Sequence, residues 1–208
     1  MRRLQLAALA LAFAAAVSGC GSARPVKYYI LDTGTMPSPS SSATAPIPVT
    51  ILVSRVMTSH LYRDDRLVYG AGNFQLGTYT DQRWAQTPAD MVQDALVNSL
   101  RSTGQYRSVL RIGSGIRGDY VVRSTLYALY EEDQPSFVAR FSMRVELFDP
   151  KSSSTVWIGN YAHDEPVSGK NVPAVVEAMD KNVRAGMQQF TSGIGQYLAE
   201  HPPQPAAH

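Results

Sequence analysis

The strongest constraint on the fold is a regular alternation of apolar and polar residues between positions 137 and 148. Successive side chains of a β-strand point to opposite faces, so this pattern predicts a strand with one face buried and the other in water. The rest of the chain must therefore cover one side of a sheet. The apolar set is Phe137, Ala139, Phe141, Met143, Val145 and Leu147, and the polar set is Arg140, Ser142, Arg144 and Glu146.

Other segments predict further strands and two helices. Short β-rich runs occupy 25–32, 49–56, 67–69, 74–80, 106–112, 120–130 and 155–163. The glycine-rich residues 70–73 predict a hairpin, and Asp149-Pro150 predicts a turn after the alternating strand. A helix should begin at Pro88 with Thr87 as its N-cap, and end at Gly104.

The second predicted helix spans 173–200, where apolar residues recur every three or four positions. We interpret this stripe as core, in preference to a lipid groove. The expected fold class is α+β, with a mixed, largely antiparallel β-sheet and two main helices packed on it. The stripe consists of Val176, Met179, Val183, Met187, Phe190, Ile194 and Tyr197.

The expected organisation is a leader followed by one domain. Residues 1–19 are interpreted as a lipoprotein signal peptide, 20–200 as a single domain, and 201–208 as a disordered tail. Within the domain, residues 33–46 are rich in serine, threonine and proline and are predicted to form a flexible loop.

The leader has a positive start at Arg2 and Arg3 and an apolar run from Leu4 to Val17, too short to span a bilayer. It ends in Val17-Ser18-Gly19-Cys20, which fits a bacterial lipobox. The expectation is that Cys20 carries lipid and becomes the first residue of the mature protein. Several acyl chains on one residue suffice for stable anchoring.

Removal of the leader also changes the charge. Losing Arg2 and Arg3 from the 19 basic residues leaves as many as the 17 acidic ones. No basic run then indicates nucleic-acid binding. Because Cys20 is the only cysteine, the sequence predicts no disulfide, thiol nucleophile or cysteine metal site in the domain.

Several motifs invite a chemical interpretation. Residues 113–118 match GxGxxG, but the alternating β-type segment that follows favours a turn over a dinucleotide site. Ser114 is interpreted as a turn serine because no histidine is placed to activate it. His163 and Glu165 share a strand face, although two ligands favour a surface strand end over a metal site.

Asp64-Asp65, beside Arg63 and Arg66, is interpreted as a solvated, ion-paired loop in preference to a catalytic acid pair. Of the four histidines, His201 and His208 lie in the expected tail, which leaves His60 and His163. The sequence predicts no catalytic, cofactor-binding or metal-binding residues, and Cys20 is the one site residue proposed.

After the lipobox cysteine, a series of short motifs follows along the chain. They are Tyr28-Tyr29-Ile30-Leu31, Ile51-Leu52-Val53, Leu61-Tyr62, Arg66-Leu67-Val68-Tyr69 and Trp84. Taken together, they resemble the ABC-type transport auxiliary lipoproteins, which include the paraquat-inducible protein C-like proteins. The resemblance runs from Cys20 to about Tyr197. The chain departs from the usual pattern in its long spacer at 33–46 and in Arg55-Val56-Met57-Thr58, which lacks a proline.

This resemblance implies a non-enzymatic lipoprotein subunit of a lipid transport system, together with a mammalian-cell-entry (MCE) domain protein, an ABC permease and its ATPase. It also implies a possible homo-oligomer. Lipoproteins with aspartate after the cysteine are retained in the inner membrane of enterobacteria; Gly21 and Ser22 therefore favour the outer membrane, facing the periplasm. Two other functions remain open: an outer-membrane assembly or envelope-structure lipoprotein, and a periplasmic hydrolase.

Overall fold

The computed structural model describes residues 25–32, 47–70, 74–133 and 135–202. The expected signal peptide, Cys20, the predicted loop at 33–46 and most of the expected tail lie outside the described residues.

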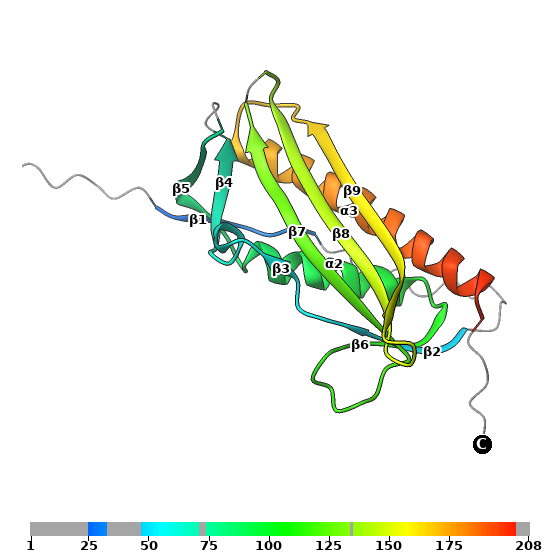
Figure 1. The fold of residues 1–208 in the computed structure, drawn as a ribbon. Coiled ribbons are helices and arrows are strands. Elements are labelled where there is room, and N and C mark those ends of the chain that lie inside the picture. The colour runs from blue at the N-terminus through cyan, green and yellow to red at the C-terminus, as the bar shows by residue number, and fades with distance from the viewer. Residues whose placement is uncertain (1–24, 33–46, 71–73, 134, 203–208) are drawn as a thin grey trace, which may run out of the picture.

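A long antiparallel meander forms the centre of the sheet (Figure 1). It consists of β7 (Tyr120–Glu132), β8 (Val138–Asp149) and β9 (Ser154–Pro166), paired along most of their lengths. The predicted turn joins β8 to β9, where Asp149 Oδ1 accepts from the backbone N–H of Lys151 at 2.8 Å. The alternation in β8 is confirmed, because its odd-numbered residues from 139 to 147 are buried.

On its other edge, β7 pairs in parallel with three successive strands. These are β2 (Ile47–Val53), β3 (Met57–Thr58) and β4 (Arg66–Gly70), with the 3₁₀ helix η1 (His60–Tyr62) between the last two. Neither β3 nor η1 was predicted, because such short elements have no periodicity of their own.

This edge of the sheet therefore divides into two arms. The β2 arm continues to β6 (Tyr106–Arg111), and the β4 arm continues through β5 (Leu76–Trp84) to β1 (Lys27–Tyr29). The predicted hairpin is confirmed by the antiparallel pairing of β4 with β5. The sheet is mixed, as predicted, with antiparallel pairing in its longest ladders.

Both helices pack on one face of the sheet, behind the strands in Figure 1. Helix α2 (Pro88–Ser102) begins as predicted, with Thr87 Oγ1 accepting from the backbone N–H of Asp90 at 3.2 Å. Gly104, with φ of 63°, follows its end. Helix α3 (Val172–Glu200) is capped by Asn171 and packs on β8, β9 and α2.

The apolar stripe of α3 is core, as predicted. Met187, Phe190 and Ile194 are buried against the sheet, and Val176 and Tyr197 at the two ends are half-buried. This contact supplies the cover that the alternation in β8 requires. Removing a side chain of this size from water stabilises the fold by roughly 1.5–3 kcal/mol.

A buried amide fixes α3 to the meander. Asn182 is fully buried; its Nδ2 donates to the carbonyls of Ala139 and His163, both at 2.9 Å. Its Oδ1 accepts from the hydroxyl of Tyr161 at 2.8 Å. Every polar atom of the amide group therefore has a partner, so the link does not carry the cost of an unpaired buried group.

Several strand boundaries differ from the predictions. Strand β1 is shorter than the predicted 25–32, β2 ends at Val53 instead of 56, and β5 continues to Trp84 instead of 80. The predicted strand ended at Thr80, but Gln82, Arg83 and Trp84 pair in parallel with β1. The edge strand that pairs with this end of β5 comes from far away in the sequence.

Candidate docking surfaces

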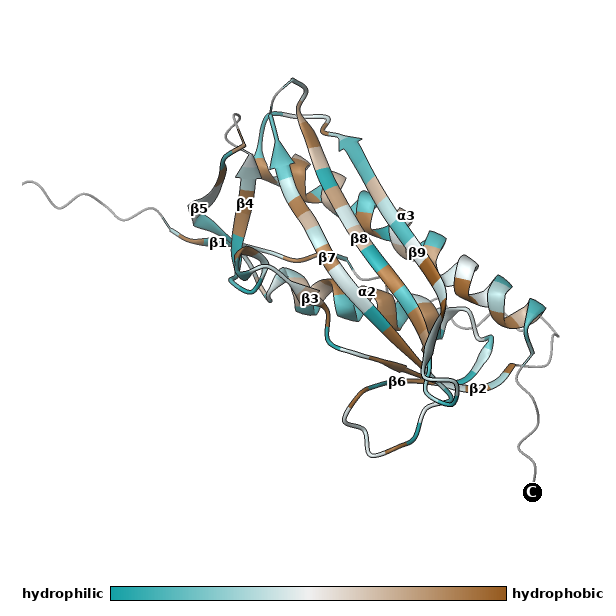
Figure 2. Cartoon of the chain, viewed as in Figure 1, coloured by the Kyte–Doolittle hydropathy of each residue, from teal (hydrophilic) through white to brown (hydrophobic). Residues whose placement is uncertain are grey.

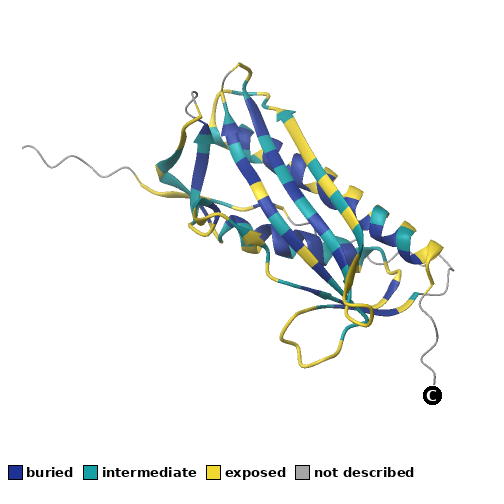
Figure 3. Cartoon of the chain, in the orientation of Figure 1, coloured by how far each residue is buried: buried dark blue, intermediate teal, exposed yellow. Residues whose placement is uncertain are grey.

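None of the described helices or strands covers the face of the sheet opposite the helices, and this face carries arginines and aromatic rings. Figure 3 views this face, with exposed and half-buried residues alternating with buried ones along β7 and β8. The guanidinium of Arg123 lies 3.6 Å from the ring centroid of Phe148. Arg140 Nη1 donates to the Tyr130 hydroxyl at 2.9 Å. We call this surface the open face.

Tyr127 projects from the open face because β7 contains a bulge. Leu126 pairs with Met143 and Ala128 with Ser142, which leaves Tyr127 as an extra residue without a partner on β8. A bulge re-aims a side chain locally. The Tyr127 side chain is consequently well exposed, at 57%.

A cavity of about 740 Å³ opens on this face where the β2 arm leaves β7. Three arginines line it, Arg55, Arg123 and Arg144. Arg144 is paired with Glu146 at 2.7 Å, whereas Arg55 and Arg123 have no carboxylate partner in the part of the chain that the structure describes. The cavity therefore has a net positive charge. Its apolar lining consists of Met57, Ile112 and Val121.

Apolar and polar groups are mixed over this region, as the hydropathy colours in Figure 2 show. Met57 is 70% exposed and Ile112 is 54% exposed, although both are large apolar side chains. Exposed apolar residues gathered beside unpaired cations are typical of an interaction surface, whereas isolated ones are ordinary.

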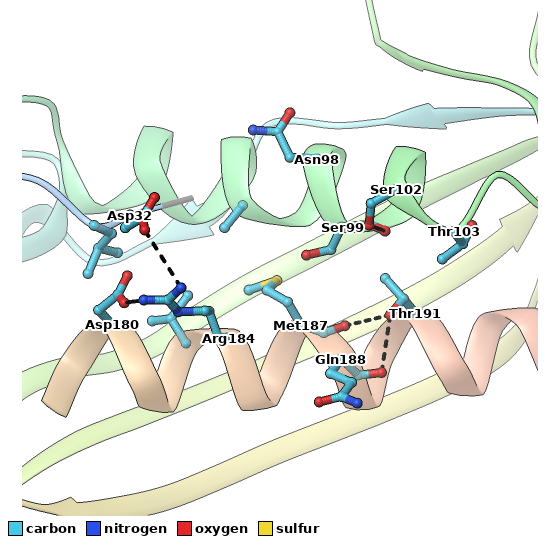
Figure 4. A pocket seen from close by; sticks show the side chains of 13 residues that line it. Asp32, Asn98, Ser99, Ser102, Thr103, Asp180, Arg184, Met187, Gln188 and Thr191 are labelled. Atoms are coloured by element: carbon cyan, nitrogen blue, oxygen red, sulfur yellow. Dashed lines mark hydrogen bonds and ion pairs between the residues drawn. The ribbon is translucent and has the colours of Figure 1, made fainter. Parts of the chain in front are cut away.

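A second, smaller pocket of about 300 Å³ lies between α2 and α3 (Figure 4). Leu31, Ala95 and Met187 contribute apolar surface, and the remaining lining is mostly polar. At one end, Arg184 pairs with Asp180 and lies 3.7 Å from Asp32 Oδ2. Burial raises the pKa of Asp180, and the hydrogen bond from Arg184 opposes that rise. The charged groups Asp180 and Arg184 that line this pocket are paired with each other.

The sequence motifs that suggested chemistry have structural roles. Residues 113–118 lie in the loop between β6 and β7, and Gly113 and Gly115 have φ of 99° and 76°. No helix follows them, so the interpretation of this motif as a turn is confirmed. Ser114 is exposed in the same loop.

His163 and Glu165 lie on the same face of β9, with His163 Nε2 3.5 Å from Glu165 Oε2. Glu165 also accepts from Lys181. The described residues contain no group of three or more metal-ligating side chains. His60 lies in η1, and His201 stacks on Tyr197 with ring centroids 4.4 Å apart. His208 lies outside the described residues.

Asp64 and Asp65 form an ion-paired loop, as interpreted from the sequence. Asp65 Oδ1 accepts from Arg83 at 2.7 Å, and Asp64 lies 3.7 Å from Arg66. A hydrogen bond from Asp65 lowers the pKa of Asp64. The sequence had suggested Arg63 as a further partner, but Arg63 donates to the carbonyl of Thr58.

Sequence reasoning missed the open-face cavity and the bulge at Tyr127. The cavity joins four separate segments of the sequence, so no local pattern marks it. One weak signal was present: Arg123 and Arg144 occupy the solvent side of two strongly alternating strands. In the part of the chain described here, no helix is long and apolar enough to span a membrane.

Solved structures similar to this one share its fold. The protein XCC0632 from Xanthomonas campestris, of the family DUF330, has a TM-score of 0.72 at 16% identity, covering 84% of this chain and 98% of its own. An uncharacterised protein has a TM-score of 0.63 at 12% identity, with 82% and 99% covered. The hypothetical protein CT253 from Chlamydia trachomatis has a TM-score of 0.51 at 12% identity, covering 74% of this chain and 99% of its own. A search of curated proteins finds no match.

A family model provides the assignment. The ABC-type transport auxiliary lipoprotein component matches residues 29–190, a span that begins in β1 and ends within α3. The match thus includes the meander, both arms of the sheet and most of both helices, in agreement with the motifs noted in the sequence. The chain belongs to the ABC-type transport auxiliary lipoprotein family.

Proposed function

We propose that this protein is a non-enzymatic, membrane-anchored periplasmic subunit of an ABC-type lipid transport system, at its outer-membrane end. In this proposal Cys20 carries the lipid anchor, and the domain binds an MCE-domain protein that connects it to the permease and ATPase. The observation that carries the proposal is the family match over residues 29–190. ATP hydrolysis takes place elsewhere in the system.

The open face is the docking surface in this proposal. Aromatic residues, methionine and arginine are enriched at protein interfaces, and energetic hot spots favour tyrosine and arginine. Tyr127, Met57 and Arg123 supply these residue types next to one another on the uncovered side of the sheet. The helices occupy the other side, so among the two faces of the sheet this is the one that the described elements leave open to a partner.

The chemistry of the open-face cavity also favours binding over catalysis. Its charged groups are three arginines and the Glu146 carboxylate, which Arg144 already engages. A hydrolase of the serine or cysteine type requires a nucleophile held by a general base, and the described residues that line the cavity include no histidine or cysteine. Arginines without internal partners are instead suited to carboxylates on a partner protein.

A site-specific crosslinking experiment tests the docking surface. A photoreactive amino acid replaces Tyr127 in the full-length lipoprotein, and in a matched control it replaces Glu177, an exposed residue of α3. We expect an MCE-domain protein to be crosslinked in cells from position 127 and not from 177. Crosslinks from 177 alone, or from 127 only to an outer-membrane assembly protein or to peptidoglycan, would contradict the proposal.

A further inference from the structure

One row of apolar side chains near the start of the domain is left exposed by the residues that the structure describes. Val26, Tyr28 and Ile30 are 43%, 64% and 60% exposed. They alternate with Tyr29, which packs against the core, and with Leu31, which is buried. Because residues two apart in an extended chain share a side, the three exposed side chains project together. We call them the β1 row.

The β1 row cannot turn inward, because the backbone beneath it is held in place. Strand β1 pairs in parallel with β5, and the Tyr29 hydroxyl donates to Gln82 Oε1 at 2.8 Å. The Tyr29 carbonyl accepts from the backbone N–H of Ala85 at 2.7 Å. Beyond the strand, Leu31 is 2% exposed between the helices and Asp32 lies beside Arg184. These contacts hold the apolar row facing outward from the domain.

The position of this row along the chain identifies what can cover it. Val26 follows Cys20 by six residues. An extended chain spans at most roughly 3.3–3.6 Å per residue, so the row begins within about 20 Å of the lipid-bearing residue. Acyl chains on Cys20 would therefore hold the row at the surface of the membrane in which they are inserted. The inference accordingly rests on the lipid anchor of the proposed function.

We propose that the β1 row sits in the interfacial region of that membrane, against phospholipid headgroups and the first methylenes of their chains. Tyrosine prefers this depth because its ring is apolar and its hydroxyl is polar. Val26 and Ile30 offer apolar branches on either side of it.

This contact gives the anchored domain an orientation. Along the sheet, β1 ends one arm and β6 ends the other. If the β1 arm rests on the membrane, the β2 arm and the arginine-lined cavity beside it project away from the membrane, into the space where a periplasmic partner approaches. A flexible tether alone would not fix this direction.

Spin labelling of the full-length lipidated protein tests this contact. Lipidation consumes the thiol of Cys20, the only cysteine, so a Tyr28→Cys variant carries one reactive thiol. The matched control is Ile158→Cys, an apolar side chain 47% exposed on β9. Each variant is labelled with a nitroxide and reconstituted in vesicles of phosphatidylethanolamine and phosphatidylglycerol. Collision rates with oxygen, which partitions into membranes, and with a water-soluble nickel chelate are then compared.

At position 28 we expect the ratio of oxygen to nickel collisions to exceed that at position 158 by several-fold. Equal, water-like ratios at both positions, with the protein still floating with the vesicles, would overturn the membrane contact alone. Shielding of position 28 from both reagents together with spin–spin broadening would mean that a second copy covers the row, and would also overturn it. Loss of flotation by the unlabelled parent protein would overturn the anchor, and with it both proposals.

Discussion

Arg140 forms a bidentate ion pair with Asp164 on the open face, with Nε 2.7 Å from Oδ1 and Nη2 2.7 Å from Oδ2. The two residues are directly paired on β8 and β9. A two-point ion pair fixes both side chains more closely than a single hydrogen bond does. It therefore helps to keep the outer strand of the meander in register with its neighbour.

The contribution of the Arg140–Asp164 pair to the free energy of unfolding should depend on pH. The hydrogen bond from Arg140 lowers the pKa of Asp164 below its ordinary value of 3.8. A lowered pKa means that the folded protein binds the proton less readily than the unfolded chain. This contribution is therefore fully present above about pH 4 and is lost as the pH falls through the lower, folded-state pKa.

Both side chains are more than a third exposed, at 38% and 43%, so water screens the pair. We expect Asp164→Asn to cost about 0.5 kcal/mol at pH 7, and less at pH 3. Urea unfolding at the two pH values measures the difference. An equal cost at both would show that the pair contributes nothing through its charge.

The buried amide of Asn182 should matter much more. Replacement by alanine removes the hydrogen bonds that Asn182 makes to the carbonyl of Ala139 and to the hydroxyl of Tyr161, and it leaves a cavity beneath α3. We expect Asn182→Ala to lower the free energy of unfolding by about 2–4 kcal/mol, and the control Tyr161→Phe, which removes one hydrogen bond, by about 1 kcal/mol. Chemical denaturation compares the two. Similar small losses would contradict the role assigned to the amide.

Two glycines of α3 should respond oppositely to alanine. At Gly186 a Cβ atom would lie 2.8 Å from a ring carbon of Phe141, which is fully buried and cannot move away. At Gly195 it would lie 2.6 Å from the end of the flexible Gln105 side chain, which can swing into solvent.

Gly186→Ala should therefore destabilise the protein by about 1–2 kcal/mol through overpacking, despite the better helix propensity of alanine. Gly195→Ala should be neutral or stabilising by up to about 1 kcal/mol. The Gln105 side chain can move away from the new methyl group, so the higher helix propensity of alanine determines the effect. Thermal melting of the two variants tests this order. A reversed order would contradict the close contact between α3 and β8 at Gly186 and Phe141.

Charge reversal in the open-face cavity should weaken partner binding without unfolding the domain. Arg55 and Arg123 lack carboxylate partners among the described residues, so Arg55→Glu and Arg123→Glu break no internal ion pair there. We expect each to reduce capture of the MCE protein at least tenfold, with the exposed Lys170→Glu as a matched control. Capture by quantitative pull-down at two salt concentrations is the measurement. Equal losses in all three variants would assign the effect to net charge alone.

The elements that sequence predicted well are those with their own periodicity or caps. The alternation at 137–148, the Thr87-Pro88 start of α2 and the apolar stripe of α3 each encode a local structure that tertiary packing then uses. The position of Asn182 in the sequence also indicates burial, since it directly precedes Val183 of that stripe.

The pairing of β7 with β2, β3 and β4 could not be predicted in the same way. Parallel neighbours are brought together by long connections, and the alternation within a strand does not indicate which strand it pairs with. The same reason explains why β5 continues through polar residues 81–83, and why the cavity that gathers Arg55, Ile112 and Arg123 was missed. The candidate site depends on tertiary assembly, whereas the helices and β8 do not.

The central claim is that an anchored domain recruits a transport partner, and it is tested most directly by crosslinking in cells. The full-length lipoprotein and a Cys20→Ala variant are expressed side by side, crosslinked and purified, and the bound proteins and lipids are identified by mass spectrometry. The account predicts an MCE-domain protein, with lipid, from the anchored form only. Recovery of an outer-membrane protein or cell-wall material alone, with no MCE-domain protein from either form, would contradict it.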